Sequence, residues 1–214
     1  MDSRALEEVM DSLQRYGAGD PDDPKAKTRG RILESASQQF VQFGYRKASV
    51  DGIARNAGVA KGTVYLYFKS KAELLMHVIA EEKKETAKRV ASILVQTEDP
   101  TKRLEAYLEM VFDLISELPV TSALMSGDRE ILIALDELDS GMIAQVQEQQ
   151  RTFLRSLLSS VPGNDPETVG EDVAVVLGLL YAAPQIMDGP GRGDIPRTDY
   201  ARMLARLIVE GVNR

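Results

Sequence analysis

The chain has 214 residues, of which 43% are hydrophobic, with no cysteine, one histidine and a formal net charge of −7. This length and apolar content suffice for a buried core in one large or two modest domains, and the absence of cysteine excludes disulfides and thiolate metal sites. The single histidine, His77, leaves little for a histidine-based metal site or catalytic relay, so we expect no metal, no cofactor and no catalytic residues. No apolar run approaches the ~20 residues of a membrane span, and no basic-then-apolar signal segment opens the chain, so we expect a cytoplasmic protein without a membrane partner.

Charge is unevenly distributed along the sequence. Residues 25–71 contain ten basic and two acidic side chains, a net charge of +8, whereas the rest of the chain carries −15. Such an asymmetry is typical of a nucleic-acid-binding module attached to another domain. The acidic part is expected to repel DNA and so to orient the basic end towards it.

An N-terminal extension, residues 1–24, precedes the basic segment. Its apolar residues recur at helical spacing and predict a short amphipathic helix over residues 3–16, with one face formed by Leu6, Val9, Met10 and Leu13. The sequence GAGDPDDP then ends the helix, because glycine, proline and aspartate together are typical of a linker. We interpret the extension as a helix that docks on the body of the protein or on a partner subunit, with regulation of DNA binding as the alternative.

The basic segment opens a predicted domain of residues 25–75. A first helix is expected from about Thr28 to Phe43, ended by Gly44, with an inward face formed by Ile32, Ala36, Phe40 and Phe43. Ser49 is then a suitable N-cap residue, because its hydroxyl accepts from an otherwise unpaired amide. A second helix follows, whose apolar face consists of Val50, Ile53, Ala54 and Ala57.

Gly58 marks a tight turn between the second helix and a third, since glycine enters the left-handed backbone region freely. In the third helix Val64 and Phe68 recur at a spacing of four and are expected to face inward. The outward side chains are then Lys61, Gly62, Thr63, Tyr65 and Tyr67. A soluble helix has little reason to expose two tyrosines beside a lysine, whereas ammonium and hydroxyl groups in a DNA major groove reach phosphates and base edges.

Three stretches, SVDGIA at 49–54, AGVAKGTVYLYF at 57–68 and KSKAELL at 69–75, resemble the DNA-binding domain of the TetR family of bacterial transcriptional regulators. The resemblance covers roughly residues 28–79, and it combines a helix-turn-helix pattern with a G-x-x-x-G-x-x-Y-x-Y-F core and a trailing K-x-E-L-L. It implies DNA contacts from Arg46, Lys47, Ser49, Lys61, Gly62, Thr63, Tyr65, Tyr67 and Lys71.

Within this set the resemblance assigns Lys61 and Gly62 to the entry into the groove, where a residue without a side chain lets the backbone approach DNA closely. Thr63 and Tyr65 are our candidates for contacts to base edges, through a methyl, hydroxyl or ring edge. These residue types discriminate between bases less sharply than arginine does.

Phosphate contacts are expected from Tyr67 and Lys71. Ser49 also approaches phosphate in the family, a role compatible with capping because a helix N-terminus already attracts anions. The sequence departs from the family pattern at Ala60, which leaves the third helix less well capped, and at Leu66, where a polar or aromatic residue is frequent.

A larger helical domain is predicted over residues 76–214. A long helix from Lys71 to about Gln96 links it to the first domain, and the charged middle of that helix, residues 81–85, is expected to be solvated. Further helices are predicted from Thr101 to Pro119, from Asp128 to about Ser160 with a possible bend at Gly141, from Glu167 to about Ile186, and from Thr198 to Val212. No segment alternates like a strand, so the predicted fold class is all-α, with a three-helix DNA-binding domain and a larger C-terminal ligand-binding and dimerisation domain.

The resemblance also implies a small-molecule cavity in the larger domain and a homodimer. Candidates for lining the cavity are Tyr107, Met110, Met125, Gln147, Gln150, Tyr181 and Met187, a composition that favours a lipophilic ligand. The family forms a four-helix dimer interface from its last two helices, where our candidates are Val173, Val176, Leu180, Met203, Leu207 and Ile208. For both sets, ordinary core packing is the alternative.

We interpret the chain as a sequence-specific DNA-binding transcriptional regulator, expected to be a repressor that a small lipophilic ligand releases from a palindromic operator. The alternative is a cytosolic helical carrier of a hydrophobic small molecule without operator recognition. Exposure of Lys61, Tyr65 and Lys71 on one surface favours the regulator, and their burial favours the carrier. An enzyme is least favoured, because no paired carboxylates, nucleophile with base or metal cluster appears in the sequence.

Overall fold

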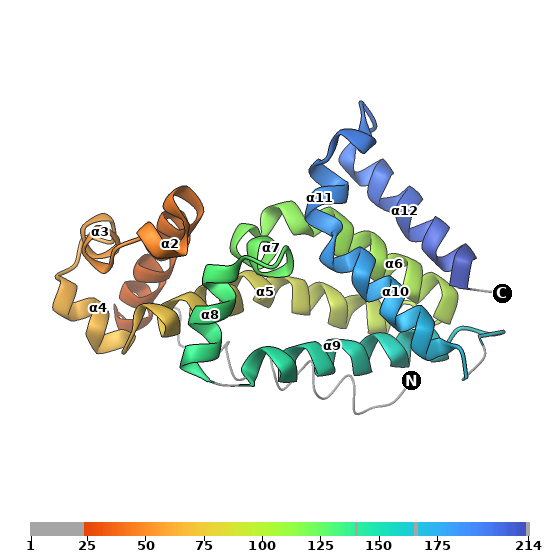
Figure 1. Ribbon diagram of the computed structural model, residues 1–214, viewed down its shortest axis with the longest axis horizontal. Helices are drawn as coiled ribbons and strands as arrows, with labels where there is room; N and C mark the ends of the chain where they lie inside the picture. Colours follow the sequence, from red (N-terminus) through yellow and green to blue (C-terminus); the bar gives the residue numbers. More distant parts are fainter. Residues whose placement is uncertain (1–23, 140, 165–166, 213–214) are drawn as a thin grey trace.

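The computed structural model describes residues 24–139, 141–164 and 167–212 (Figure 1). Over these residues the chain forms α-helices and two 3₁₀ turns and no strand, which confirms the predicted all-α class. The predicted helix at residues 3–16 and its linker lie outside the described residues. Among the described helices, none is both long and apolar enough to cross a bilayer.

The helices follow one another along the chain with short connections. Their bounds are α2 (Pro24–Lys47), α3 (Val50–Asn56), α4 (Lys61–Tyr67), α5 (Lys71–Gln96), α6 (Pro100–Leu114), α7 (Pro119–Met125), α8 (Arg129–Leu138), α9 (Met142–Ser159), α10 (Val169–Tyr181), α11 (Ala183–Asp188) and α12 (Arg197–Val212). Helices α2, α3 and α4 form a head at one end of an elongated molecule, and α5 runs from this head into the body (Figure 1).

The head has a core whose members come from all three of its helices and from the start of α5, with further members from α7 and α8. Its fully or nearly fully buried side chains include Ile32, Leu33, Ala36, Phe40, Ile53, Ala54, Val64, Phe68 and Leu74. The predicted inward position of Phe43 is wrong, since this side chain is 45% exposed. Gly44 interrupts α2 with φ 75°, and Tyr45, which follows that break, packs on Phe40 with ring centroids 5.7 Å apart in the place expected for Phe43.

Helix α5 has the predicted bounds, but its charged middle is not a solvated run. Glu82 accepts hydrogen bonds from the amides of Val120 at 3.1 Å and Thr121 at 2.7 Å, so it caps the start of α7. Lys83 is half-buried as well. The sequence could not indicate the role of Glu82, because the amides that it caps lie 38 and 39 positions further along the chain.

Several predicted long helices are divided by local backbone geometry. Gly141 adopts φ 99° and separates α8 from α9, instead of bending one continuous helix. The segment between the helices predicted to end at Pro119 and to begin at Asp128 is itself the short helix α7, because proline is well placed in the first turn of a helix. Helix α10 likewise ends at Tyr181, and Pro184 lies in the first turn of the separate helix α11.

The body has a second core, centred on α6. Leu104, Leu108 and Phe112 on this helix are completely buried, and they face Leu158 of α9 and Val173 of α10 within one cluster. Helix α12 packs along α6, and α10 packs along α9 (Figure 1). Because α10 and α12 are held by different neighbours, a groove remains between them.

Candidate nucleic-acid interface

The second head helix begins with the predicted cap. The Ser49 hydroxyl accepts a hydrogen bond from the amide of Gly52 at 3.1 Å, and Ser49 itself has extended backbone angles. Gly58 then makes the turn with φ 68°, a region that L-residues with a Cβ rarely adopt. Helix α4 starts at Lys61 without a side-chain cap from Ala60, as the sequence predicted. Its free amides are therefore available to an anion.

Helix α4 presents an open outer face. Val64 and Phe68 are buried as predicted, whereas Lys61, Gly62 and Tyr65 are exposed. A Cβ built on Gly62 meets no atom within 4 Å, so nothing in this chain requires a glycine there. The predicted contact residues Thr63 and Tyr67 are half-buried. Leu66 is 85% exposed, the largest exposed fraction among the exposed large apolar side chains described.

Lys61 is paired within the head. Its Nζ lies 2.8 Å from Oδ2 of Asp51 on α3, and this hydrogen bond raises the pKa of Lys61. Both side chains are largely exposed, so water competes with the pair and its contribution to stability is small. The ammonium can therefore exchange Asp51 for another anion at little cost.

The structure places Arg46 and Lys71 where the head meets the body. The Arg46 amide donates to Oε2 of Glu130 on α8 at 3.2 Å, and its guanidinium lies 3.9 Å from Oε1 of the same carboxylate. Lys71 donates from Nζ to the carbonyls of Tyr45 at 2.9 Å, Ala48 at 3.2 Å and Arg46 at 3.3 Å, and it lies 4.3 Å from the Tyr45 ring centroid. Burial lowers the pKa of Lys71. Its three N–H donors are thus engaged inside the protein.

A surface hollow of about 380 Å³ lies at this junction, lined by Tyr45, Arg46, Lys71, Glu130, Ile133, Ala134 and Glu137. Lys47, the neighbour of Arg46, is exposed. Sequence reasoning missed Glu130, because nothing in the local sequence of α8 indicates that its first turn reaches the end of α2.

A second set of side-chain contacts joins α2 to α5, and the sequence did not predict it. Arg29 Nη2 lies 2.9 Å from Nδ1 of His77, and the guanidinium lies 5.5 Å from the ring centroid of Phe68. Phe68 and His77 meet edge to face at 5.4 Å. Since arginine can only donate, Nδ1 of His77 accepts and its ring is neutral. Burial and the nearby Arg29 charge lower the pKa of His77. Among the described residues no group of three metal-ligating side chains converges.

The structure brings some of the predicted effector residues together inside the body. Tyr181 of α10 donates from its hydroxyl to Oε1 of Gln150 on α9 at 3.1 Å. The Tyr107 ring of α6 meets Phe153 edge to face at 5.3 Å, and burial raises the pKa of Tyr107 to about 12. Tyr181 contributes a smaller rise, so the two phenols lie near each other. Phe153 was missed in the sequence, because it reads as ordinary core.

The remaining effector candidates are distributed differently. Met187 is completely buried, and Met110 and Met125 are half-buried against the body core. Gln147 is exposed and does not join the tyrosines, so its predicted place in a cavity lining is wrong. It lies three residues before Gln150 on α9, and the amphipathic helix turns it to the outside.

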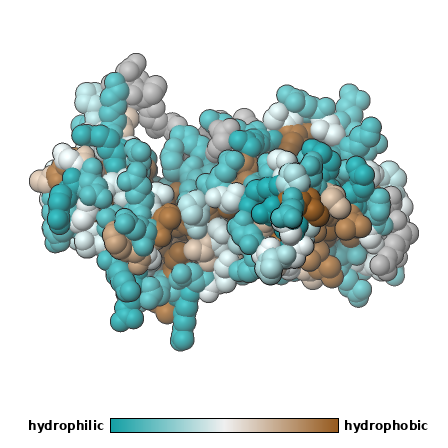
Figure 2. Space-filling view, turned by 90° about the horizontal axis from the view of Figure 1, so that it is seen from above, coloured by the Kyte–Doolittle hydropathy of each residue, from teal (hydrophilic) through white to brown (hydrophobic). Residues whose placement is uncertain are grey.

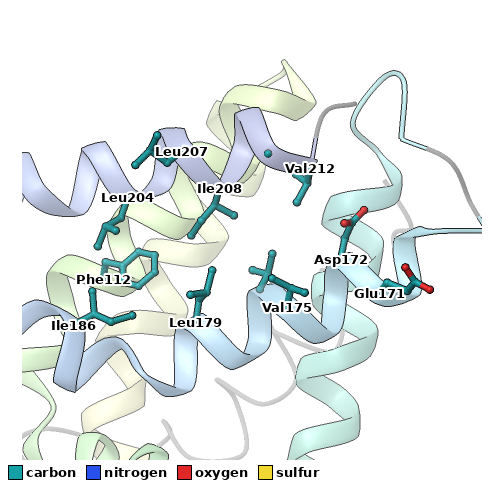
Figure 3. A pocket seen from close by; sticks show the side chains of 12 residues that line it. Phe112, Glu171, Asp172, Val175, Leu179, Ile186, Leu204, Leu207, Ile208 and Val212 are labelled. Atoms are coloured by element: carbon teal, nitrogen blue, oxygen red, sulfur yellow. The ribbon is translucent and has the colours of Figure 1, made fainter.

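A groove of about 490 Å³ runs between α10 and α12 (Figure 3). Its apolar walls carry Val175 (62% exposed), Leu207 (65% exposed), Leu179, Leu204 and Ile208, with Glu171 and Asp172 at one end. Met203, on the same helix as Leu207, is 52% exposed. Figure 2 shows apolar side chains reaching the surface at the end of the molecule that carries α12.

The structure places two of the predicted dimer residues in the subunit core and a third at the groove. Val173 and Leu180 are buried in the subunit core, and Val176 is buried at the base of the groove. Helix α10 is apolar on nearly every side, so periodicity could not indicate which of its faces points inward. Val175 and Leu179 of α10 line the apolar walls of the groove together with Val176.

Comparisons with known proteins agree with this architecture. Residues 32–78 match the family model of bacterial regulatory proteins, tetR family. The chain is 39% identical over 92 residues to the transcriptional activator FasR of Mycolicibacterium smegmatis, which covers 43% of this chain and 42% of FasR. It spans 42% to 63% of the length of this and three further curated relatives.

Two solved structures share the fold over nearly the whole chain. One is FadR of Bacillus subtilis in complex with stearoyl-CoA, with a TM-score of 0.65 and 18% identity over 86% of this chain and 98% of FadR. The other is AibR in complex with isovaleryl coenzyme A and operator DNA, with a TM-score of 0.68 and 17% identity over 84% of this chain and 97% of AibR. Residues 32–78 therefore match the DNA-binding segment of the TetR family of bacterial regulators, at α2, the helix-turn-helix pair α3 and α4 and the start of α5, and nearly the whole chain shares its all-α fold with these two regulators.

Proposed function

We propose that the protein is a sequence-specific DNA-binding transcriptional regulator, acting as a repressor that a small lipophilic molecule releases from its operator. The observation that carries the proposal is the open face of α4. There Lys61 and Tyr65 are exposed beside Gly62, whose missing side chain leaves the backbone free to approach another molecule. A short helix with uncapped amides and such a face suits the DNA major groove.

The DNA contacts are assigned from exposure and chemistry. Lys61 and Tyr65 face a bound duplex directly, and Thr63 and Tyr67 reach it from the edges of the same face. Phosphates are expected at the N-terminus of α3, near Ser49, and at the flanking cations Arg46 and Lys47. Lys71 joins them only if phosphate displaces one of its three carbonyl partners.

A homodimer is proposed from the groove between α10 and α12. Its exposed apolar side chains, Val175, Met203 and Leu207, lie on the two helices that the family uses for dimerisation. A two-fold dimer would present two α4 helices to two half-sites, which matches a palindromic operator. We also propose the division into residues 1–24, 25–75 and 76–214, with action on DNA in the cytoplasm.

The effector is proposed to be a lipophilic small molecule bound in the body. The cluster of Tyr107, Phe153, Gln150 and Tyr181 offers aromatic surface with few polar groups, which suits an apolar ligand. Related regulators named for fatty acid metabolism, and solved structures with stearoyl-CoA or isovaleryl coenzyme A, support an acyl compound. If the effector lowers the affinity of the protein for DNA by some factor, thermodynamic linkage requires that DNA lowers the affinity for the effector by the same factor.

The carrier is the weaker alternative. A carrier without operator recognition predicts that the outer side chains of α4 are buried, whereas Lys61 and Tyr65 are exposed. Lys71 alone is half-buried and engaged. A catalytic role is not proposed, because the curated relatives of this chain are transcriptional regulators.

Fluorescence anisotropy of the full chain tests the proposal, with labelled DNA from upstream of its own gene, scrambled DNA and two salt concentrations. A Lys61→Ala/Tyr65→Ala variant removes the α4 contacts, and Lys102→Ala, an exposed lysine of the body, is the matched control. We expect tight binding to the upstream DNA that the double variant loses and the control keeps. Each lost phosphate contact should reduce the log–log salt slope by about 0.9. Equal weak binding of all three proteins to both DNAs would refute the regulator and favour the carrier.

A further inference from the structure

Helix α5 carries a polar layer between the two hydrophobic cores. On its inward stripe Ile79 belongs to the head core and Val90 to the body core, and both are buried. Lys83 and Thr86 lie between them at positions four and seven residues after Ile79, on the same side of the helix. Both are half-buried. The helix therefore turns a cation and a hydroxyl towards a place where its periodicity otherwise puts aliphatic side chains.

The acidic neighbour of Lys83 is already engaged. The two carboxylate oxygens of Glu82 accept from the amides of Val120 and Thr121 at the start of α7, which packs against α5 (Figure 1). The charge of Glu82 favours the ammonium of Lys83, but burial outweighs it and lowers the pKa of Lys83. Within the described part of the chain no hydrogen bond or ion pair engages that ammonium.

Two hydroxyls next to Glu82 also lack partners. Oγ1 of Thr86 and Oγ1 of Thr121 are both buried and make no hydrogen bond among the described residues. The Thr121 amide donates to Glu82 at 2.7 Å, and Thr86 lies one helical turn after Glu82 on α5, so both threonines are neighbours of the same glutamate. Buried polar groups without partners are rare in native proteins, because each costs desolvation free energy.

Each of the unused hydrogen-bonding groups in this layer can donate. An ammonium group has three N–H donors and no acceptor, and each threonine supplies an O–H. An anion with several acceptor oxygens can satisfy all of them, and the layer lies between the two aliphatic cores to which Ile79 and Val90 belong, so an anion with an apolar tail suits these surroundings. We propose that Lys83, Thr86 and Thr121 bind the carboxylate of an aliphatic acid. This rests on the proposed function, and it names the chemical class of the effector and the residues that recognise it.

The test measures binding of decanoate, 1-decanol and decanoyl-coenzyme A to the full chain by isothermal titration calorimetry. The variant is Lys83→Met, which keeps the length and loses the charge. Lys84→Met is the matched control, because Lys84 is the adjacent lysine and is paired with Glu81 at 3.3 Å. We expect decanoate to bind the wild type and the control equally and Lys83→Met at least about tenfold more weakly. The alcohol should bind all three proteins alike. Thr86→Val should weaken decanoate binding in the same direction.

Folding of the variant is checked separately by thermal unfolding without any additive. Removing a half-buried, unpaired charge should raise the melting temperature of Lys83→Met above that of the wild type. A lower melting temperature would mean that the ammonium already has a partner, and it would overturn the proposal. Equal binding of decanoate to the wild type and to Lys83→Met would overturn it as well, as would binding of decanoyl-coenzyme A alone, independent of Lys83.

Operator DNA separates this inference from the proposed function. With the upstream DNA bound, decanoate should release the wild type at concentrations that leave Lys83→Met on the DNA. If neither protein binds that DNA, the proposed function fails. If both bind it and decanoate releases both equally or neither, the proposed function stands and the carboxylate site is refuted.

Discussion

Substitution of Lys71 tests how much its hydrogen bonds stabilise the head. In the Lys71→Met variant the side chain keeps its bulk but loses three hydrogen bonds to the carbonyls of Tyr45, Arg46 and Ala48 and its contact with the Tyr45 ring. These carbonyls follow the break in α2 at Gly44, so the ammonium acts as a substitute for the missing helical donors.

The expected loss is about 2 kcal/mol. Hydrogen bonds from a charged group contribute roughly 1.5–3 kcal/mol each when buried, and a cation–π contact about 0.5–1 kcal/mol. Lys71 is half-buried, so water replaces part of what the variant loses and the sum is well below three full bonds. Urea denaturation followed by circular dichroism measures the change, with Lys69→Met, an exposed lysine two residues earlier, as the control.

DNA binding by the same variant distinguishes the two roles of this lysine. If Lys71 only braces the end of α2, its loss lowers stability while the slope of log affinity against log salt stays that of the wild type. If it also contacts a phosphate, that slope falls by about 0.9. A variant as stable as the wild type would refute the bracing argument, whatever its affinity for DNA.

Further predictions concern the junction, the histidine and the groove. Glu130→Gln should release Arg46 from its ion pair and strengthen operator binding by about two- to fivefold, since an exposed pair contributes roughly 0–1 kcal/mol; anisotropy that shows no gain would contradict this. The pKa of His77 is lowered in the folded state, so its stabilising contribution is complete above about pH 6.5 and is lost as the pH falls towards the lowered value. His77→Gln should remove that part of the pH dependence of the urea midpoint between pH 7.5 and 5.5. Leu207→Lys should turn a dimer into a monomer in light scattering, whereas Ile133→Lys, at another exposed apolar position, should not.

The head could be predicted well because its signals are local. Ser49 capping, the turn at Gly58 and the inward pair Val64 and Phe68 each depend on residues within a few positions. The prediction that Phe43 points inward was wrong because of a contact between residues far apart in the sequence. The place expected for Phe43 is taken by Tyr45, whose ring is held between Phe40 and the ammonium of Lys71, and no local pattern reports that contact.

The body could be predicted only in outline. Its helical periodicity was readable, but the places where helices break depend on single residues such as Gly141, whose φ of 99° ends any regular helix. The buried face of each helix was harder to predict than the helix itself. On α10 apolar residues surround the axis, so Val173 and Val175 look alike in sequence although one is completely buried and the other largely exposed. Only the positions of α6, α9 and α12 distinguish them.

The two hydrophobic cores suggest how a signal could pass from the body to the DNA. The head core includes Val120 of α7 and Ile131, Ala134 and Leu135 of α8, as well as the first turns of α5. These helices therefore pack as one unit with the head, and the change to the body core occurs within α5 between Ile79 and Val90. Glu82 fixes the start of α7 to α5 at that level, and Arg46 binds the first turn of α8. A molecule that enters the polar layer next to Glu82 would press on α7, and because α7 and α8 are packed to the head, their displacement would turn α4 with them. In a dimer, distances between spin labels on the two α4 helices should then change when decanoate binds the wild type and stay constant in Lys83→Met.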